Sequence, residues 1–142
     1  MTFDGKSAGY AILRVALGVA FLFYGIHKFQ TGVGATMEMM TRQFERTFLP
    51  GLLVKGFGAA LPSIEVVVGL LLVLGLFTRV ALVVAGLVMI ALTAGLAILG
   101  NAPTVASNLL FLIVIWVLLS HGEDDALGLD TLRKRPPSST PS

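Results

Sequence analysis

The chain has 142 residues, of which 56% are hydrophobic and 13% are charged, with a mean hydropathy of +0.90 and a formal net charge of +2. A soluble domain carries about a quarter charged residues, so this composition predicts an integral membrane protein. The apolar runs are continuous rather than alternating, which predicts helices and not a barrel. The absence of cysteine excludes disulfides, thiolate metal ligands, iron–sulfur clusters and thiol redox chemistry by this chain. The small and scattered positive charge does not indicate nucleic acid as a partner.

Four apolar segments predict an all-α bundle of four transmembrane helices, forming a single membrane domain over residues 1–130. We expect these helices at residues 8–29, 62–77, 80–99 and 104–120. No signal-peptide pattern precedes the first segment, which we therefore interpret as a retained membrane helix. Pro62 is expected in the first turn of the second helix, where its missing N–H costs nothing.

Residues 35–48 have a different pattern, in which apolar side chains recur at helical spacing and charged residues occupy the other faces. They predict an amphipathic helix that lies at the membrane interface or packs over the bundle. Residues 52–61 are apolar and rich in Gly and Ala, and they either begin the next helix or form a half-turn at the interface. Residues 131–142 are expected to be a disordered cytoplasmic tail.

The distribution of basic residues predicts the orientation of the bundle. The positive-inside rule places the end with more Lys and Arg in the cytoplasm. One end carries six of them and the other four, so we expect a multi-pass protein of the bacterial cytoplasmic (inner) membrane with both termini cytoplasmic. The first set is Lys6, Arg14, Arg79, Arg133, Lys134 and Arg135, and the second is Lys28, Arg42, Arg46 and Lys55.

Polar residues near the predicted outer end of the helices are the candidate functional group. Glu65 is the strongest signal, because a carboxylate at the bilayer centre costs roughly 2.5–3.5 kcal/mol and needs a partner. His27 and Lys28 end the first helix at the same depth. Tyr24 lies one turn below His27, and Asn108 lies at the start of the fourth helix. We expect these five side chains to converge on one polar pocket.

Each of these residues has a functional and a structural interpretation. Glu65 either accepts a proton or hydrogen bond beside a quinone head group, or forms an ion pair that locks the first helix to the second. His27 either hydrogen-bonds a quinone carbonyl, or is a C-terminal helix cation together with Lys28. No nucleophile–base pair or metal-ligand pattern is present, so catalytic residues stay unknown and we expect no metal. At most, the chain is a subunit of a membrane oxidoreductase.

Two arginines open similar segments. Residues 14–20 (RVALGVA) and 79–85 (RVALVVA) differ at one of seven positions. This similarity indicates either a duplicated helical hairpin or the chance repetition of apolar sequence. We expect Arg14 and Arg79 to extend to the cytoplasmic interface and hold lipid phosphate. Close helix contacts are expected at small residues, namely Gly18, Gly25, Gly69, Gly75, Gly86 and Gly95.

The order of three motifs resembles the DoxX family of small bacterial membrane proteins. They are Arg14-x3-Gly18, then Phe23-Tyr-Gly25-Ile-His27-Lys28, then Glu65-x3-Gly69-Leu-Leu-Leu-x-Leu-Gly75-Leu-Phe-Thr-Arg79, and a late Gly128-Leu-Asp130 is similar to the family's ending. The resemblance implies a four-helix membrane bundle and a link to redox metabolism. Founding DoxX members are small subunits associated with thiosulfate:quinone oxidoreductase.

Two functional interpretations follow. The first is a membrane subunit of quinone-linked redox metabolism, with a quinone head group among the outer polar residues. The second is a non-catalytic structural or docking subunit of a larger membrane complex. A small solute transporter is a weaker third. We expect no covalently bound cofactor, with a quinone as the candidate cofactor. The expected partners are membrane lipids, other membrane or peripheral subunits, and further copies of the chain.

Overall fold

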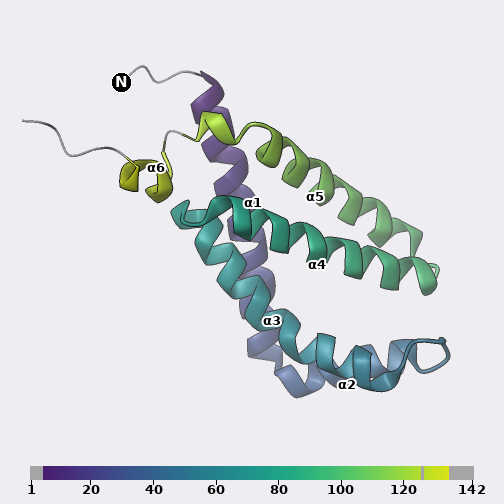
Figure 1. Ribbon diagram of the computed structural model, residues 1–142. Helices are drawn as coiled ribbons and strands as arrows, with labels where there is room; N and C mark the ends of the chain where they lie inside the picture. The colour runs from purple at the N-terminus through teal and green to yellow at the C-terminus, as the bar shows by residue number, and fades with distance from the viewer. Residues whose placement is uncertain (1–4, 126, 135–142) are drawn as a thin grey trace, which may run out of the picture.

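The structure, a computed structural model, describes residues 5–125 and 127–134, which form helices without any strand. Four of these helices are long and apolar enough to cross a membrane, which confirms the all-α membrane fold. In Figure 1 the four long helices form one bundle, and two short helices follow the last of them. The elements are α1 (Gly5–Thr31), α2 (Val33–Phe44), α3 (Gly51–Leu74), α4 (Thr78–Ile98), α5 (Ala102–Ser120), η1 (Gly122–Asp124) and α6 (Leu129–Arg133).

Helices α1 and α3 pack backbone against backbone. A Cβ atom added at Gly18 would lie 2.8 Å from the backbone nitrogen of Val73, and one at Gly25 would lie 2.8 Å from that of Val66. Gly69 faces the backbone of α1 in the same way. Because any larger side chain would push the helices apart, these glycines set the close approach that brings polar residues of α1 and α3 together.

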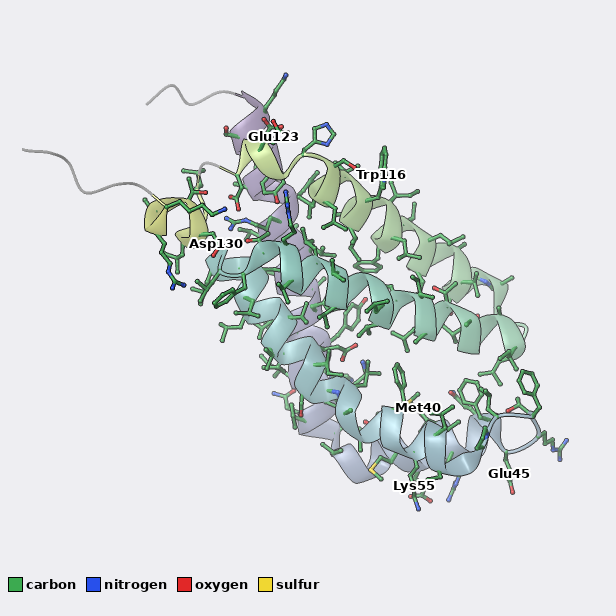
Figure 2. The ribbon with its side chains drawn as sticks, viewed as in Figure 1. Met40, Glu45, Lys55, Trp116, Glu123 and Asp130 are labelled. Atoms are coloured by element: carbon green, nitrogen blue, oxygen red, sulfur yellow. The ribbon has the colours of Figure 1, made fainter. Side chains whose placement is uncertain are left out.

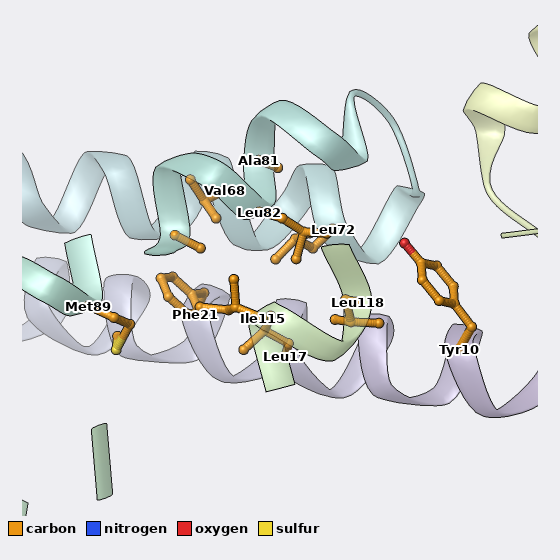
Figure 3. Close-up of a cluster of buried hydrophobic side chains, with 11 residues drawn as sticks. Tyr10, Leu17, Phe21, Val68, Leu72, Ala81, Leu82, Met89, Ile115 and Leu118 are labelled. Atoms are coloured by element: carbon orange, nitrogen blue, oxygen red, sulfur yellow. The ribbon is translucent and has the colours of Figure 1, made fainter. Parts of the chain in front are cut away.

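The hydrophobic core lies where α1, α3, α4 and α5 meet, and Figure 3 shows its side chains converging between these helices. Much of α5 faces outward, including Trp116, which is exposed and projects away from the bundle in Figure 2. Because lipid is as apolar as the core, dispersion contacts rather than water exclusion hold these faces together. The largest fully buried core side chains are Phe21, Leu72, Leu82 and Leu118.

Helix α3 begins eleven residues before the expected span, at Gly51, and it ends at Leu74. Pro62 therefore lies inside the helix and not in its first turn. Residues 52–61 are apolar enough to extend the helix, and an internal proline removes only one backbone hydrogen bond while bending the axis. Figure 1 shows α3 changing direction near its middle. The predicted starts of the other spans lie within three residues of the observed ones.

Helix α2 packs along the first half of α3, which is the second of the two arrangements expected for residues 35–48. Its Met37 and Met40 contact α3 at Gly58. The ring of Phe44 reaches across to α4, where a Cβ added at Gly95 would lie 3.0 Å from it. The helix ends at Phe44, so residues 45–48 lie in the turn that follows.

The segment after α5 folds back onto the end of the bundle where α4 begins (Figure 1). The backbone N–H of Asp130, in α6, donates to the backbone oxygen of Gly75 at 3.1 Å. Residues 131–133 belong to α6 and not to a disordered tail. Residues 135–142, the rest of the expected tail, lie outside the described residues.

Candidate functional site

An ion pair joins the last turn of α1 to the middle of α3. Lys28 Nζ lies 2.8 Å from Oε1 and 2.7 Å from Oε2 of Glu65, so it binds both carboxylate oxygens. The Glu65 side chain is 4% exposed and that of Lys28 is 25% exposed. Gly25, one turn before Lys28, provides the close backbone contact that brings the two groups within reach. The cation expected beside Glu65 is therefore Lys28.

His27 lies on a different side of α1 from this ion pair, whereas Tyr24, one turn before Lys28, lies beside the Lys28 ammonium. The Tyr24 ring contacts Phe111 of α5 edge-on, with centroids 6.5 Å apart, and its centroid lies 5.9 Å from Lys28 Nζ. His27 is exposed and lines a shallow depression formed by α1 residues alone. The expectation that His27 joins Glu65 in one pocket is therefore wrong, because consecutive helical residues point about 100° apart.

Asn108 is buried in α5, and its Nδ2 has no hydrogen-bond partner within the described ranges. Helices α1 and α5 run in opposite directions (Figure 1), and Tyr24 meets Phe111 between them. Asn108 lies about one turn before Phe111, just as Lys28 lies one turn after Tyr24. This register is consistent with a similar depth for Asn108 and Lys28, and a pocket shared by Asn108 and Glu65 stays a prediction.

A groove of about 570 Å³ opens at the same end of the molecule. We call it the outer groove. It lies between the α2–α3 hairpin and the C-terminal half of α4, with Thr104 of α5 at one edge. Lys28 is part of its wall, and its other lining residues are mostly apolar. The polar lining residues besides Lys28 are Thr36, Gln43 and Thr104.

A second ion pair lies at the opposite end of the bundle, where α1 begins. Arg14 is 2% exposed, and its Nη1 lies 3.7 Å from Oδ1 of Asp125. Gly75 and Gly128 surround the guanidinium, and a Cβ added at either would lie within 3 Å of Nη1. The expected contact of Arg14 with lipid phosphate is therefore wrong, because the folded-back segment covers this side chain.

Burial raises the pKa of the Asp125 carboxyl, and the Arg14 guanidinium opposes that rise. Both Nε and Nη1 of Arg14 lack a hydrogen-bond partner in the part of the chain that the structure describes, and so does Oδ1 of Asp125. At 3.7 Å the two groups attract each other without forming a hydrogen bond. This inner ion pair is therefore buried more deeply than the outer pair and is less completely satisfied.

Asp130 caps the N-terminus of α4 from outside the helix. Its Oδ1 accepts from the backbone N–H of Phe77 and its Oδ2 from that of Thr78, each at 3.0 Å. Figure 2 shows Asp130 beside the start of α4. Burial acts to raise the pKa of Asp130, but the N–H groups of Thr78 and Phe77 outweigh it, so this pKa is lowered. The cap satisfies backbone donors that a helix start leaves open.

A polar pocket of about 230 Å³ lies beside this cap. We call it the inner pocket. Tyr10, Thr78, Arg79, Asp125 and Lys134 contribute to its wall. Arg79 is exposed here, so its contact with lipid phosphate stays a prediction. The two similar segments that open with arginine thus place one side chain in the interior and the other at the surface.

Sequence reasoning missed the roles of Asp125 and Asp130. Asp125 belongs to the acidic run that follows α5, to which we assigned no role. Asp130 was noted only through the Gly128-Leu-Asp130 motif. The signal that points to Asp125 is Arg14 itself, because a cation inside an apolar helix needs a counter-charge at the same end.

A protein-family model described as Methylamine utilisation protein MauE matches the chain over residues 6–102. The match covers more than half of the chain, so the chain belongs to this family, and the DoxX resemblance is not specifically supported. No curated protein and no solved structure matches the chain. The matched region includes Arg14, Lys28 and Glu65, whereas Asp125 and Asp130 lie beyond it.

Proposed function

We propose that this member of the MauE family is a membrane-embedded accessory subunit of a redox system, which serves methylamine utilisation as the family description indicates. Its polar residues hold helices in place so that the bundle can support partner subunits. The observation that supports this role most directly is the Lys28–Glu65 ion pair, in which both carboxylate oxygens are bound by one ammonium group.

The geometry of this pair favours a lock between α1 and α3. A proton-accepting carboxylate needs a free oxygen facing its substrate. Here both oxygens of Glu65 face Lys28 at hydrogen-bond distance, and the side chain is almost fully buried. His27, the other proton-transfer candidate, faces away on the surface of α1. The arrangement therefore supports an accessory role better than proton transfer by Glu65.

The test compares Glu65→Gln with the unmodified chain in cells that grow on methylamine. We expect less assembled complex and a lower melting temperature, with unchanged methylamine oxidation per assembled complex. Glu38→Gln, an exposed acidic residue of α2, is the matched control. A fall in activity per complex at unchanged complex yield and stability would contradict the accessory role. Native mass spectrometry that finds only free monomer would also contradict it.

The outer groove supports a second candidate function, a quinone-binding subunit of the same system. A quinone needs a hydrogen-bond donor for its carbonyl oxygens and an apolar channel for its isoprenoid chain. Lys28 supplies a donor in the groove wall, and small residues of α4 leave room beside it. The polar side chains of Thr36, Gln43 and Thr104 also line the groove. His27 and Tyr24 have no part in this version of the site.

Groove-filling variants test this candidate. Ala94 lines the outer groove, whereas Ala97, on the same helix and also exposed, does not. We expect quinone in the lipid extract of the purified protein, its loss from Ala94→Phe and its retention by Ala97→Phe. An extract without quinone from the unmodified protein would exclude this candidate and leave the accessory role standing.

A further inference from the structure

We propose that the inner pocket binds the head group of a phospholipid that carries both a phosphate and a primary ammonium, namely phosphatidylethanolamine. This inference is independent of the proposed function. It rests on the chemistry of the pocket wall at the opposite end of the bundle from the outer groove.

Two buried polar atoms of the inner pocket lack hydrogen-bond partners within the residues that the structure describes. They are Oγ1 of Thr78 and Oδ1 of Asp125. Thr78 is 6% exposed and the Asp125 side chain is 9% exposed. Buried polar atoms of this kind are paired in nearly all native proteins, so a ligand or water is expected beside them. The pocket's 230 Å³ greatly exceeds the roughly 10–15 Å³ that one water requires.

The charges around the inner pocket have both signs. Arg79 and Lys134 are exposed cations in its wall, while Asp125 supplies a carboxylate oxygen that has no hydrogen bond within the described residues, although Arg14 lies 3.7 Å from it. The carboxylate of Asp130 also borders the pocket, but its two oxygens accept from the backbone at the start of α4. A simple anion would be repelled by Asp125, and a simple cation would be repelled by Arg79 and Lys134. A zwitterion can pair its negative group with the two cations and its positive group with Asp125.

The head group of phosphatidylethanolamine matches this arrangement. Its phosphate can take charge-assisted hydrogen bonds from Arg79 and Lys134, and the Thr78 hydroxyl can donate to it as well. Its ammonium can donate to Oδ1 of Asp125. The quaternary ammonium of phosphatidylcholine has no N–H, so it cannot make this last bond.

The pocket lies at the ends of two apolar helices, which favours a lipid over a soluble zwitterion. Its wall includes Leu82 of α4 and Leu118 and Leu119 of α5, of which Leu82 and Leu118 are buried in the core. These residues belong to helices long and apolar enough to cross the membrane. A head group in the pocket would therefore leave its acyl chains beside the same helices that form the pocket.

The test uses the full chain in detergent, exchanged with defined lipids and analysed by native mass spectrometry. Phosphatidylethanolamine, its N-methyl and N,N-dimethyl forms and phosphatidylcholine are compared at equal concentration. We expect the largest fall in retention at the last step of this series, where the last N–H is lost, and about tenfold between its ends, which is the value of one charge-assisted hydrogen bond. This arm needs no substitution, so it does not depend on the folding of a variant.

Three variants of pocket residues, with one control, locate the site. Because Arg79 and Lys134 are exposed, Arg79→Gln and Lys134→Gln should fold normally and weaken retention of the whole series, whereas Lys55→Gln at the other end should not. Asp125→Asn should remove the preference for the primary ammonium. Equal retention of phosphatidylethanolamine and phosphatidylcholine by the unmodified chain would overturn the proposal. Complete displacement of the lipid by stoichiometric soluble phosphoethanolamine would also overturn it, because the acyl chains would then contribute nothing.

Discussion

The two ends of the bundle bury an ion pair in contrasting ways. At the outer end, Lys28 binds both oxygens of Glu65 at 2.7 and 2.8 Å. At the inner end, Arg14 and Asp125 are 3.7 Å apart, and both carry polar atoms without a partner in the described part of the chain. The outer pair joins two spans directly. The inner pair forms only when the segment after α5 folds back.

This difference shows that burial of a charge does not by itself define its role. A buried pair stabilises when its geometry is close and its hydrogen bonds are complete, and it costs free energy when they are not. By that standard the Lys28–Glu65 pair is a structural lock. The Arg14–Asp125 pair is less complete, and it fits into the bundle only because Gly75 and Gly128 leave room for the guanidinium.

Breaking the outer pair should have the largest effect. Glu65→Ala leaves the Lys28 ammonium without a partner, and we expect the free energy of unfolding to fall by about 2–4 kcal/mol. This expected loss is smaller than that for a fully buried ion pair, because 25% of the Lys28 side chain is exposed to solvent. Thermal unfolding in detergent measures it. The double variant Lys28→Met/Glu65→Leu should recover most of the loss. If the double variant were as unstable as Glu65→Ala, the unpaired Lys28 ammonium would not be the cause of the lost stability.

Breaking the inner pair should cost less. Arg14→Met removes an attraction that lacks a direct hydrogen bond, and we expect a loss of about 1–2 kcal/mol near neutral pH. Burial raises the pKa of Asp125, and without the guanidinium that opposes it this pKa rises further. A group with a raised folded-state pKa contributes stability that is complete below its unfolded-state pKa and lost as the pH rises through the folded value.

The pH profile distinguishes this effect from a simple loss of packing. Melting temperatures of Arg14→Met should approach those of the unmodified chain as the medium becomes acidic, because Asp125 is then neutral. Arg14→Met/Asp125→Asn should not show this pH dependence. A constant difference between Arg14→Met and the unmodified chain at every pH would mean that the charge of Asp125 is unimportant.

Sequence patterns predicted the parts of the fold that depend on local composition. Continuous apolar runs placed the four spans, and the depth of Glu65 limited its partner to Lys28 or His27. Depth alone could not choose between these two, because the choice depends on the rotation of α1 against α3. That rotation is set by the glycine contacts with α3 at Gly18 and Gly25.

Two expectations failed where distant segments decide the outcome. Arg14 has the position of a residue that extends to the membrane surface, and only the fold of residues 122–125 and 127–133 covers it. Pro62 has the position of a first-turn residue, but the apolar stretch before it continues the helix. Neither result follows from a local pattern, because each depends on packing between segments that are far apart in the sequence.

Removing the cap at the inner end should have a smaller effect, with the opposite pH dependence. Asp130→Ala leaves two backbone donors of α4 open, which costs about 1 kcal/mol. The pKa of Asp130 is lowered in the folded state. Its contribution is therefore present above its unfolded-state pKa and lost as the pH falls through the folded value. Asp130→Asn keeps one acceptor oxygen but places an amide N–H donor beside the other backbone N–H, so it should recover only part of this loss. An Asp130→Ala penalty that grows in acid would contradict the cap.

Breaking a third ion pair should have the smallest effect on stability. This exposed pair is the reference with which the two buried pairs are compared. Arg42 donates to Glu38 one turn away on α2, and both side chains are largely exposed. Such pairs contribute about 0.2–0.5 kcal/mol, and salt weakens them. We therefore expect Glu38→Gln to lower the melting temperature slightly in dilute buffer and not at all in high salt. A loss of stability as large as that of Asp130→Ala would contradict this expectation. It would mean that the exposed surface of α2, which forms one wall of the outer groove, stabilises the bundle as much as the inner cap does.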